Sequence, residues 1–531
     1  GLIYRGERIA NWCVKHQTAL SDLEIKHEER QDPLYYIKYG PVVLATARPE
    51  TKFGDTAVAV HPGDRRYQKY IGKDLEIETL LGPAKIKVIA DKAVDPHFGT
   101  GVVKVTPAHD PDDFEIGKRH NLEVRQVIGK DGRLNEKAGL YAGLKVAEAR
   151  KKVAEDMQAR GLMQKIDATY KHNVAVCYKC GNVLEPLVMP QWFVAMTKSL
   201  RNPKSEIRNP KSGKSLRDMA VEAVKSGKIK FVPKRFEKVF FHWMKNLRDW
   251  NISRQITWGI RIPAWFCVSC GEPKINPKIK GNWFFVRHGQ TDWNVEHRIQ
   301  GQSSDIPLNE RGRAQAHDTA RQLAGHRIDL IISSDSRRAR ETAKIIAGEL
   351  GVEVVYDDML RERNYGVLEG KTNQEVGEEE LAQLRRQPDY APDSGESLRE
   401  VEKRVYQALA RHRRQHHHGH KNIVIISHDT ALRVILGKLK GFDLVDDGQM
   451  RIGNAGVVHF AVGSACKRCG SDFIEQDPDV LDTWFSSGQW PFATLGYQIS
   501  DIRNQKSGSS RVPKDFKTFY PTDVMETGWD I

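Results

Sequence analysis

The sequence predicts a multidomain fold that joins α/β parts to a smaller all-β part. Its 531 residues are enough for three or more domains, each with a core of its own. Six of its seven cysteines form Cys-x-x-Cys pairs that are separated by long stretches of chain. The hydrophobic pattern also changes, from short β-type runs before about residue 165 to alternating strands and helices after about residue 282.

The amino-acid composition indicates the broad class of protein. An apolar content of 39% and a charged content of 29% are typical of soluble globular proteins. No apolar run reaches the roughly 18 residues of a membrane span. The first segment, GLIYRGERIANWC, has neither an initiating Met nor a secretory signal pattern, so we expect a cytoplasmic protein and an internal part of a longer chain. The net charge of +14 suits a polyanion such as RNA, although solvated Lys and Arg alone also explain it.

The cysteines and one histidine form four short pairs with the spacing of zinc ligands. Three are the motifs CYKC, CVSC and CKRC, and the fourth is CVKH, where histidine takes the last place. This spacing lets two side chains reach one tetrahedral Zn²⁺ from a tight turn. The pairs are Cys13/His16, Cys177/Cys180, Cys267/Cys270 and Cys466/Cys469. They predict two structural zinc sites, one Cys₃His and one Cys₄; disulfides or scattered buried thiols are the alternative interpretations.

Spacing alone does not say which pairs share a metal. Chain order suggests that the first pair joins the second, and the third joins the fourth. The gaps are 160 residues between His16 and Cys177 and 195 residues between Cys270 and Cys466. Both gaps have the size of a domain rather than a loop, so each zinc site is expected to clamp the base of an insertion.

The first insertion covers residues of about 40–165 and contains short β-type runs punctuated by Gly and Pro, which predict a small β-barrel. Its segments ATARPETKFGDTAVAVHP and VDPHFGTGVVKVTPAHDPDDFEIGKRHNL resemble the editing domain of class I synthetases for branched aliphatic amino acids. The second segment is most similar to the valine enzymes. Valine and threonine are nearly isosteric, so a valine pocket rejects threonine by only about a hundredfold. The resemblance implies hydrolysis of threonyl-tRNA(Val).

Two carboxylates and a strand face form the candidate editing site. Lys104 and Thr106 share one face of a strand by period-two spacing, and Asp110 and Asp113 lie in the first turn of an expected helix. The resemblance implies that water is the nucleophile without a metal, that Asp110 binds the α-ammonium, and that Asp113 with Lys104 binds the hydroxyl. Its implied editing residues are Arg48, Thr51, Lys104, Thr106, Asp110 and Asp113. The alternative is that the acidic run is a helix N-cap, and both can hold together.

The rest of the chain outside the second insertion resembles the body of valyl-tRNA synthetases. The similarity lies in GLIYRGERIANWC, EPLVMPQWFVAM, QDPDVLDTWFSSGQWPFATLGY and FYPTDVMETGWDI. It implies that Trp484 lines the valine pocket, whereas an ordinary core aromatic is the alternative. It also implies tRNA(Val), and valine and threonine as aminoacyl groups, as partners of a monomer. Two departures from the family pattern are Ala47, where a Thr is usual, and Ile260, where a His is usual.

The ATP-binding motifs of class I synthetases are absent in context. HHGH at 417–420 and MTKS at 196–199 match only by chance, because they lie in the wrong surroundings. We expect that ATP and Mg²⁺ serve the full-length parent rather than this part. The repeats RNPKS at 201–205 and 208–212 are polar and contain Pro, so they predict flexible surface insertions; a basic tRNA contact is the alternative.

The second insertion, residues of about 282–463, alternates strands and helices and predicts a three-layer α/β domain. The expected strands are WFFVRHG, IDLIISS, VEVVYD and NIVIISHD. The expected helices are RAQAHDTARQLAG, RRARETAKIIAGELG and SLREVEKRVYQALARHRRQHHHG, the last closing on Gly419. RHRRQHHHGH at 411–420 is expected to be a basic helix end; metal binding is the alternative.

Phosphoryl transfer through histidine needs an imidazole, two Arg side chains for the dianion and an acid for the leaving oxygen. Such residues occur here at strand ends and helix starts, and their motifs resemble the histidine phosphatase (phosphoglycerate mutase-like) superfamily. The resemblance implies a small phosphorylated substrate. It assigns His288 as nucleophile, Arg287 and Arg338 to the phosphate, Glu362 as acid and His428 to the pocket. Asp429 stands where the family usually has Gly, and its charge is expected to weaken dianion binding.

The combined prediction is a β-barrel editing domain, zinc-bearing parts of a synthetase body and an inserted phosphatase. The expected parts are body 1–39, editing domain 40–165, body 166–281, phosphatase insert 282–463, and body with the start of the second catalytic half 464–531. The leading hypothesis is a valine–tRNA ligase fragment with editing and a phosphatase-type insert. A phosphomonoesterase on a synthetase scaffold is the second, and a binding-only fusion is the third.

Overall fold

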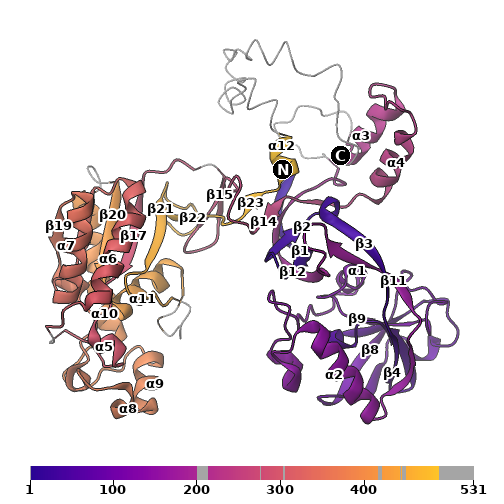
Figure 1. Ribbon diagram of the computed structural model, residues 1–531, viewed down its shortest axis with the longest axis horizontal. Coiled ribbons are helices and arrows are strands. Elements are labelled where there is room, and N and C mark those ends of the chain that lie inside the picture. The colour runs from indigo at the N-terminus through magenta and orange to yellow at the C-terminus, as the bar shows by residue number, and fades with distance from the viewer. Residues whose placement is uncertain are drawn as a thin grey trace. The chain divides into compact units, whose positions relative to one another are not determined.

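The computed structural model describes residues 2–199, 213–275, 277–302, 305–416, 421–442, 444 and 450–488. It divides into two compact units, one of Gly1–Arg261 with Pro478–Ile531 and one of Ile262–Asp477 (Figure 1). Each unit has its own core, which confirms a multidomain chain. In the described part of the chain, no helix has the length and apolar character needed to cross a membrane. The RNPKS repeats, the HHGH segment and the segment FYPTDVMETGWDI lie outside the described residues.

A long pair of antiparallel strands, β1 and β12, forms the central part of one sheet in the first unit. Strand β1 pairs with β12 from Ile3↔Val194 to Trp12↔Glu185, and the strand order of this sheet is β13-β12-β1-β2. Its strands are β1 Ile3–Cys13, β2 Thr18–Leu20, β12 Glu185–Val194 and β13 Trp250–Asn251. The same unit also contains β14 Ser253–Arg254, β23 Val480–Leu481, α3 Leu216–Lys225, α4 Phe236–Asn246 and α12 Thr483–Ser487.

The β-rich part of the same unit contains two small sheets and a ribbon. The sheet orders are β10-β4-β5 and β7-β8-β6-β9, and β11 pairs with β3. One apolar core includes Leu44 of the first sheet and Val88 of the second. Among the described strand pairs, no hydrogen-bonded ladder joins the two sheets, so closure into a barrel remains a prediction. The strands are β3 Ile25–Gln31, β4 Leu34–Tyr39, β5 Val42–Thr46, β6 Ala57–Val60, β7 Asp74–Thr79, β8 Gly82–Ala90, β9 Val102–Val105, β10 Met163–Asp167 and β11 Lys171–Cys177.

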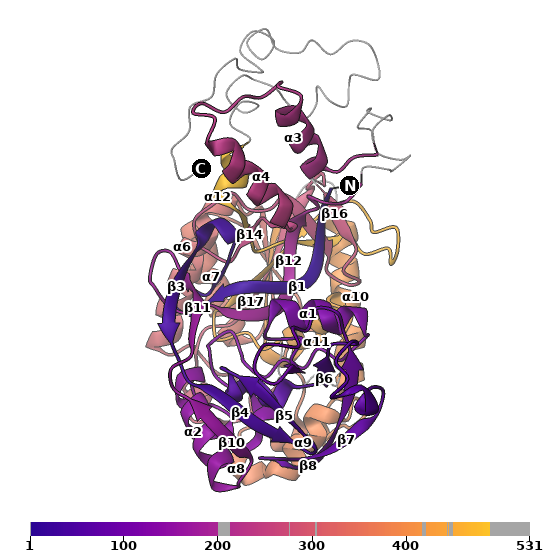
Figure 2. The same ribbon diagram turned by 90° about the vertical axis from the view of Figure 1, so that its right-hand side faces the viewer.

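Two helices complete this part. Helix α2, Val146–Ala159, lies beside β10 (Figure 2). Helix α1, Pro111–Arg119, begins where the sequence predicts, because the Asp110 side chain accepts hydrogen bonds from the free N–H groups of the first turn. Pro111 fits the first helical position, since its missing N–H is not needed there. Lys118 and Arg119 in the last turn complement the helix dipole.

An eight-stranded sheet forms the centre of the second unit, in the order β16-β15-β22-β21-β17-β20-β18-β19. The four strands from β17 to β19 are parallel, and β21, β22, β15 and β16 continue the sheet antiparallel. The strands are β15 Ala264–Cys267, β16 Pro273–Ile275, β17 Gly281–Arg287, β18 Leu330–Ser333, β19 Val354–Tyr356, β20 Asn422–Ser427, β21 Val457–Val462 and β22 Phe473–Gln476. Strand β15, which ends at Cys267, and strand β22, which follows Cys466 and Cys469, thus share a sheet with the second insertion.

Helices cover both faces of this sheet, which confirms the three-layer α/β prediction (Figure 1). Phe285 and Ile425 pack into one core with α10 and α11, while their neighbours Phe284 and Val424 pack into another with α6 and α7. This alternation follows from the two faces of a strand. The helices are α5 Asp292–Val295, α6 Glu310–Leu323, α7 Arg337–Leu350, α8 Asn373–Val376, α9 Glu378–Arg386, α10 Leu398–His416 and α11 Asp429–Leu439. The expected end of α10 at Gly419 lies outside the described residues.

Candidate active sites and metal centres

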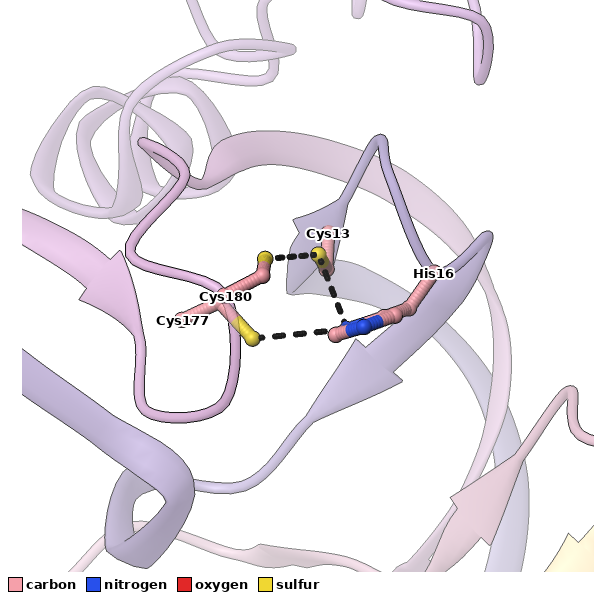
Figure 3. Close-up of side chains that lie close together, drawn as sticks. All are labelled: Cys13, His16, Cys177 and Cys180. Carbon is pink, nitrogen blue, oxygen red and sulfur yellow. Dashed lines mark hydrogen bonds between the residues drawn. The ribbon is translucent and has the colours of Figure 1, made fainter.

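The first cysteine cluster forms where the ends of β1 and β11 meet. Figure 3 shows the side chains of Cys13, His16, Cys177 and Cys180 converging. The Nδ1 atom of His16 lies 3.6 Å from the Sγ atoms of both Cys13 and Cys177. The Sγ atoms of Cys13 and Cys180 are 3.7 Å apart. The structure therefore brings together the two pairs that chain order suggests.

The second cluster forms in the other unit, between the turns after β15 and before β22. The Sγ atoms of Cys267 and Cys469 are 3.5 Å apart, and those of Cys270 and Cys466 are 3.6 Å apart. Three of the four Cys-containing turns end on glycines with φ of +68° to +78°, a left-handed conformation that glycine adopts without strain. These glycines are Gly181, Gly271 and Gly470.

Both clusters fit a tetrahedral zinc ion. With Zn–S of about 2.3 Å and Zn–N of about 2.0 Å, neighbouring ligand atoms are expected roughly 3.5–3.8 Å apart. The observed separations of 3.5–3.7 Å match this range and exceed the roughly 2.05 Å of a disulfide bond. In each cluster all four ligand atoms lie within 4.8 Å of one another, and all seven cysteines are unbridged. Four protein ligands per site leave no open position, as in structural zinc sites.

Lys104 is the centre of the candidate editing site in the β-rich part. Its Nζ donates to Thr51 Oγ1 at 2.8 Å, to Asp55 Oδ1 at 3.2 Å, and to Thr106 Oγ1. An ammonium group has three N–H donors, so the protein itself uses all of them. The sequence analysis did not find Asp55, although it lies in the same segment, ATARPETKFGDTAVAVHP, that supplies Arg48 and Thr51. The structure thus brings Thr51 and Thr106 together at Lys104, and Asp55 adds a carboxylate that contacts Lys104 and Thr106.

The two predicted carboxylates lie beside this cluster but differ in exposure. Asp113 is buried, and its Oδ2 accepts the backbone N–H of Thr106 at 2.8 Å. Burial raises the pKa of Asp113 to about 7, and the neighbouring Asp110 carboxylate adds to the rise. Asp110 is exposed, and its Oδ1 caps α1 by accepting the N–H groups of Asp112 at 2.8 Å and Asp113 at 3.0 Å. The N-cap interpretation is therefore correct for one of its oxygens.

Arg48 lies in a second, adjoining ion-pair cluster. Its guanidinium donates to Glu185 at 2.6 Å and to Glu50 at 3.0 Å. Arg150 of α2 also pairs with Glu50, at 2.9 Å. Glu50 is fully buried, and the paired charges lower its pKa although burial alone would raise it. These contacts join the segment around Arg48 to β12 and α2, which gives Arg48 a visible structural role.

His109 is a further buried polar residue that the sequence analysis missed. Its Nε2 accepts the backbone N–H of Val127 at 2.9 Å and of Ile128 at 3.3 Å. The ring proton must then lie on Nδ1, which is 3.4 Å from the Pro186 carbonyl oxygen. Burial, and next the charge of Arg48, lowers the pKa of His109 to about 3, so the ring is neutral. Its contacts support the loop that follows α1 rather than a proton-transfer step.

Trp484 lies near the start of the short helix α12 and is partly buried. Asp482 caps that helix through the N–H groups of Trp484 at 2.8 Å and Phe485 at 3.0 Å, and it also pairs with the buried Arg254. The departure residue Ile260 is exposed. The described residues thus fix the backbone of Trp484, while its predicted role in a valine pocket remains a prediction.

In the second unit, His288 is buried immediately after the end of β17. Its Nδ1 lies 2.7 Å from the carbonyl oxygen of Gly289, so Nδ1 carries the proton. Its Nε2 lone pair accepts a hydrogen bond of 3.3 Å from Nε of Arg338. Burial, and then the charges of Arg338 and Arg287, hold the pKa of His288 well below its ordinary value. The geometry presents a neutral imidazole whose Nε2 can act as a nucleophile.

The two predicted phosphate-binding arginines occupy different environments. Arg338 is fully buried at the start of α7, and burial lowers its pKa to about 10. Its Nη2 donates to the carbonyl oxygen of Gly301 at 3.1 Å, and its Nη1 has no hydrogen-bond partner. Arg287 Nη1 donates to Ile452 at 2.9 Å and lies 3.3 Å from Asp429 Oδ1. This distance is that of an ion pair. The two groups are not aligned for a hydrogen bond, since Asp429 Oδ1 has no hydrogen-bond partner.

Glu362 and His428 complete the predicted set. The carboxylate of Glu362 accepts backbone N–H groups of Arg363 at 2.8 Å and Thr430 at 3.1 Å. Burial, and next the charge of Asp429, raises its pKa. His428 is buried with its ring 5.1 Å from that of His288, and its Nε2 lies 2.9 Å from Ser334 Oγ. Buried imidazoles, guanidinium groups and a protonatable acid converge here, as phosphoryl transfer requires.

Two family models match parts of the chain. Residues 1–301 and 412–531 match the sequence model of the class I tRNA synthetases for isoleucine, leucine, methionine and valine. The chain belongs to this family. Residues 283–470 match the histidine phosphatase superfamily (branch 1), so the chain also contains a histidine phosphatase domain. The two matches overlap at 283–301 and 412–470, where β17 and β20 pair inside the α/β sheet. That pairing places the β17 and β20 segments of the overlap in the α/β sheet of the phosphatase domain.

Valine–tRNA ligases are among the relatives of this chain. That of Symbiobacterium thermophilum is 50% identical over 280 residues, which is 51% of this chain and 28% of the relative. That of Clostridium acetobutylicum is 49% identical over 284 residues, which is 52% of this chain and 30% of the relative. The matched part thus spans under a third of the length of these relatives.

Solved structures resemble the second unit. A structure titled mycobacterial hydrolase 1 is 31% identical and covers 38% of this chain and 98% of that chain, with a TM-score of 0.33. A mycobacterial glucosyl-3-phosphoglycerate phosphatase in complex with VO₃ is 28% identical, with the same coverage and a TM-score of 0.33.

Proposed function

We propose that this chain is the part of a valine–tRNA ligase that edits, hydrolysing threonyl-tRNA(Val). The observation that carries the proposal is the Lys104 cluster, a buried ammonium held by a carboxylate and two threonines beside the carboxylates of Asp113 and Asp110. A threonine-specific pocket needs polar groups that a valine side chain cannot satisfy. The identity of about half to valine–tRNA ligases supports the choice of amino acid.

The exposure of the carboxylates suggests their roles. Asp110 is at the surface with one oxygen committed to the helix cap, so its other oxygen is assigned to the substrate α-ammonium. Asp113 lies deeper and is assigned to the threonine hydroxyl. Because Lys104 has no free N–H, we do not assign it to direct contact with the hydroxyl. We assign to it an electrostatic role, in which its positive charge acts on the nearby Asp113 carboxylate. Thr51 and Thr106 hold Lys104, and Arg48 anchors the segment.

The reaction assigned to this site is ester hydrolysis by water. The water oxygen bonds to the aminoacyl carbonyl carbon, the bond from that carbon to the ribose oxygen breaks, and the ribose oxygen takes a proton from the water. Free threonine and tRNA(Val) with an intact 3′ end leave. No metal is assigned to this step.

Selective deacylation by the purified chain tests this function. Threonyl-tRNA(Val) is expected to be hydrolysed and valyl-tRNA(Val) spared, and Asp110→Ala is expected to abolish the difference. Asp112→Ala is the matched control, because Asp112 lies in the same helical turn with a side chain 87% exposed. Equal hydrolysis of both esters, or loss of activity in the control alone, would refute the proposal.

We infer that both cysteine clusters hold structural zinc, with no step of either reaction assigned to it. ATP, Mg²⁺ and the charging reaction are assigned to the complete ligase, where Trp484 would line the valine pocket. The same assignment implies a monomeric cytoplasmic protein whose macromolecular partner is tRNA(Val).

A second activity, phosphomonoester hydrolysis, is proposed for the histidine phosphatase domain because His288 presents Nε2 to the Arg338 guanidinium. Nε2 attacks phosphorus, the ester P–O bond breaks, and the leaving oxygen takes the proton of Glu362. The oxygen of a water then bonds to phosphorus while Glu362 takes a proton from that water. The bond between phosphorus and Nε2 breaks, its electron pair returns to the His288 imidazole, and inorganic phosphate leaves. Turnover of p-nitrophenyl phosphate that is lost in His288→Ala would support this activity. Unchanged turnover in that variant would exclude it.

A further inference from the structure

Asp55 is the one acidic residue in hydrogen-bond contact with the Lys104 ammonium among the described residues. It follows the 3₁₀ helix Pro49–Gly54, and its side chain is only 3% exposed. Its Oδ1 accepts from Lys104 Nζ at 3.2 Å and from Thr106 Oγ1 at 2.6 Å, and its Oδ2 accepts from Tyr39 Oη at 2.6 Å. The carboxylate is therefore held at both oxygens.

The charge of Asp55 matters because the site is buried. The Lys104 side chain is 8% exposed, and an unpaired ammonium in such a place costs several kcal/mol. A second ammonium, that of Lys52, is also buried, and the charges of Lys52 and Lys104 repel each other. Asp55 counters both, since its charge also favours protonated Lys52. Removing this one negative charge leaves two buried cations to repel.

A chain of hydrogen bonds connects Asp55 to Asp113. Thr106 donates its hydroxyl proton to Asp55, and its backbone N–H donates to Asp113 Oδ2 at 2.8 Å. The position of Thr106 is thus fixed on one side by Asp55 and on the other by the carboxylate assigned to the threonine hydroxyl. Without Asp55, the Lys104 ammonium loses the carboxylate that it contacts, while the charge of Asp113 still attracts it.

We propose that Asp55 is a positioning residue of the editing site. It keeps the Lys104 ammonium away from Asp113 and turned to Thr51 and Thr106, so that Asp113 stays free to bind the substrate hydroxyl. This proposal rests on the editing function proposed above. It assigns no contact between Asp55 and substrate, because both of its oxygens are occupied by protein donors.

The test is single-turnover hydrolysis of threonyl-tRNA(Val) by the full chain between pH 6 and pH 9. Asp55→Asn keeps the shape and removes the charge. We expect a rate at saturating enzyme at least tenfold below wild type, little change in the half-saturating concentration, and a displaced pH–rate profile. Asp156→Asn is a matched control, because Asp156 also holds a tyrosine and a lysine, Tyr141 at 2.7 Å and Lys152 at 2.9 Å. It is expected to leave rate and profile unchanged.

A double variant separates positioning from general destabilisation. If Asp55 acts through Lys104, Asp55→Asn combined with Lys104→Met will lose no more rate than Lys104→Met alone. Additive losses, or a wild-type rate and profile in Asp55→Asn, would overturn the proposal. Should Asp55→Asn not fold, Tyr39→Phe removes one of the hydrogen bonds to Asp55 and keeps the charge. It is then expected to show a smaller loss with a pH displacement in the folded protein, and an unchanged profile would overturn the proposal.

The wild-type chain distinguishes this failure from failure of the proposed function. If wild type hydrolyses threonyl-tRNA(Val) selectively and Asp55→Asn does so equally well, only the proposed role of Asp55 is refuted. Absence of selective hydrolysis by folded, zinc-loaded wild type removes the editing function, and the role of Asp55 with it.

Discussion

Ser269 donates a hydrogen bond from its Oγ to the backbone carbonyl oxygen of Leu439 across 2.7 Å. Ser269 lies between the two cysteines of the motif CVSC, and Leu439 is the last residue of α11. Helix α11 begins directly after His428. The second cysteine cluster is therefore bonded to the helix that begins at the phosphatase site.

Apolar packing also connects the region of the second cysteine cluster to the core of the phosphatase domain. Phe473 of β22 packs against Trp283 of β17 with ring centroids 5.6 Å apart, and both belong to the core that contains α10 and α11. Strand β22 also pairs with β21 through Ala461↔Ile474 and Val462↔Phe473. The strands next to the cysteine turns, β15 and β22, thus extend the phosphatase sheet. The turns that hold the second cysteine cluster and the phosphatase sheet therefore belong to one unit of the fold.

Loss of the second cluster is accordingly expected to destabilise the phosphatase domain. Cys466→Ser should lower the midpoint of its thermal unfolding by about 5–15 °C, because a structural zinc contributes several kcal/mol to folding. Calorimetry together with zinc content measures this effect. Cys13→Ser removes a ligand of the cluster in the other unit and serves as control. Equal shifts of the same transition in both variants would contradict the coupling.

The pH dependence of phosphatase turnover should report the acid Glu362. Burial and Asp429 raise its pKa, and only the protonated form can give a proton to the leaving oxygen. Turnover of an alkyl phosphate should therefore fall as pH rises through this raised pKa. Glu362→Gln should remove that limb and lower the rate about 10²–10⁴-fold. The loss should be smaller for p-nitrophenyl phosphate, whose leaving group needs no proton; equal losses would argue against this role.

Asp429 should weaken binding of a phosphate dianion. Its carboxylate lies 3.3 Å from Arg287 Nη1 and competes with the ligand for that positive charge. Asp429→Asn is expected to tighten inhibition by orthovanadate about tenfold, and a salt titration should reduce the gain. Asp389→Asn is the control, because Asp389 pairs with Arg399 and its side chain is 73% exposed. An unchanged inhibition constant for Asp429→Asn would exclude the competition.

Local patterns predicted the parts of this structure that depend on neighbouring residues. The Asp110 cap, the strand that ends at Arg287 and the cysteine turns all follow from short-range rules and appear at the predicted positions. The pairing of the cysteine motifs also followed chain order. These features need no knowledge of distant contacts.

The missed features depend on contacts between distant segments. Glu50 looks like an ordinary surface glutamate in the sequence, yet it pairs with Arg150 one hundred positions away. Asp55 gains its importance only when β9 delivers Lys104, and His109 only when the loop at Val127 covers it. The continuation of the phosphatase sheet into β22 likewise requires two segments on either side of a turn to meet. A single sequence contains no local signal for such pairings.

Asp113 gives a prediction in which stability and pH are linked. Its pKa is about 7 in the folded chain, whereas the ordinary value is 3.8. Between pH 3.8 and pH 7 the folded state therefore binds a proton at Asp113 that the unfolded state has lost. Its contribution therefore makes the protein less stable as pH rises from about 4 to about 7. Asp113→Asn retains an oxygen for the Thr106 N–H and removes the charge. It should raise stability at pH 8 by on the order of 3 kcal/mol and flatten the dependence of the unfolding midpoint on pH.

Thermal unfolding at intervals from pH 4 to pH 8 measures this linkage, with Asp112→Asn as the matched variant. Asp112 contributes the same charge in the same helical turn, but its side chain is 87% exposed, so water already solvates the carboxylate. The difference between the two variants isolates the burial of Asp113 from the net charge of the helix. Parallel curves for Asp113→Asn, Asp112→Asn and wild type would mean that the Asp113 carboxylate is not desolvated. It would then be an ordinary surface acid rather than a group held ready for the substrate hydroxyl.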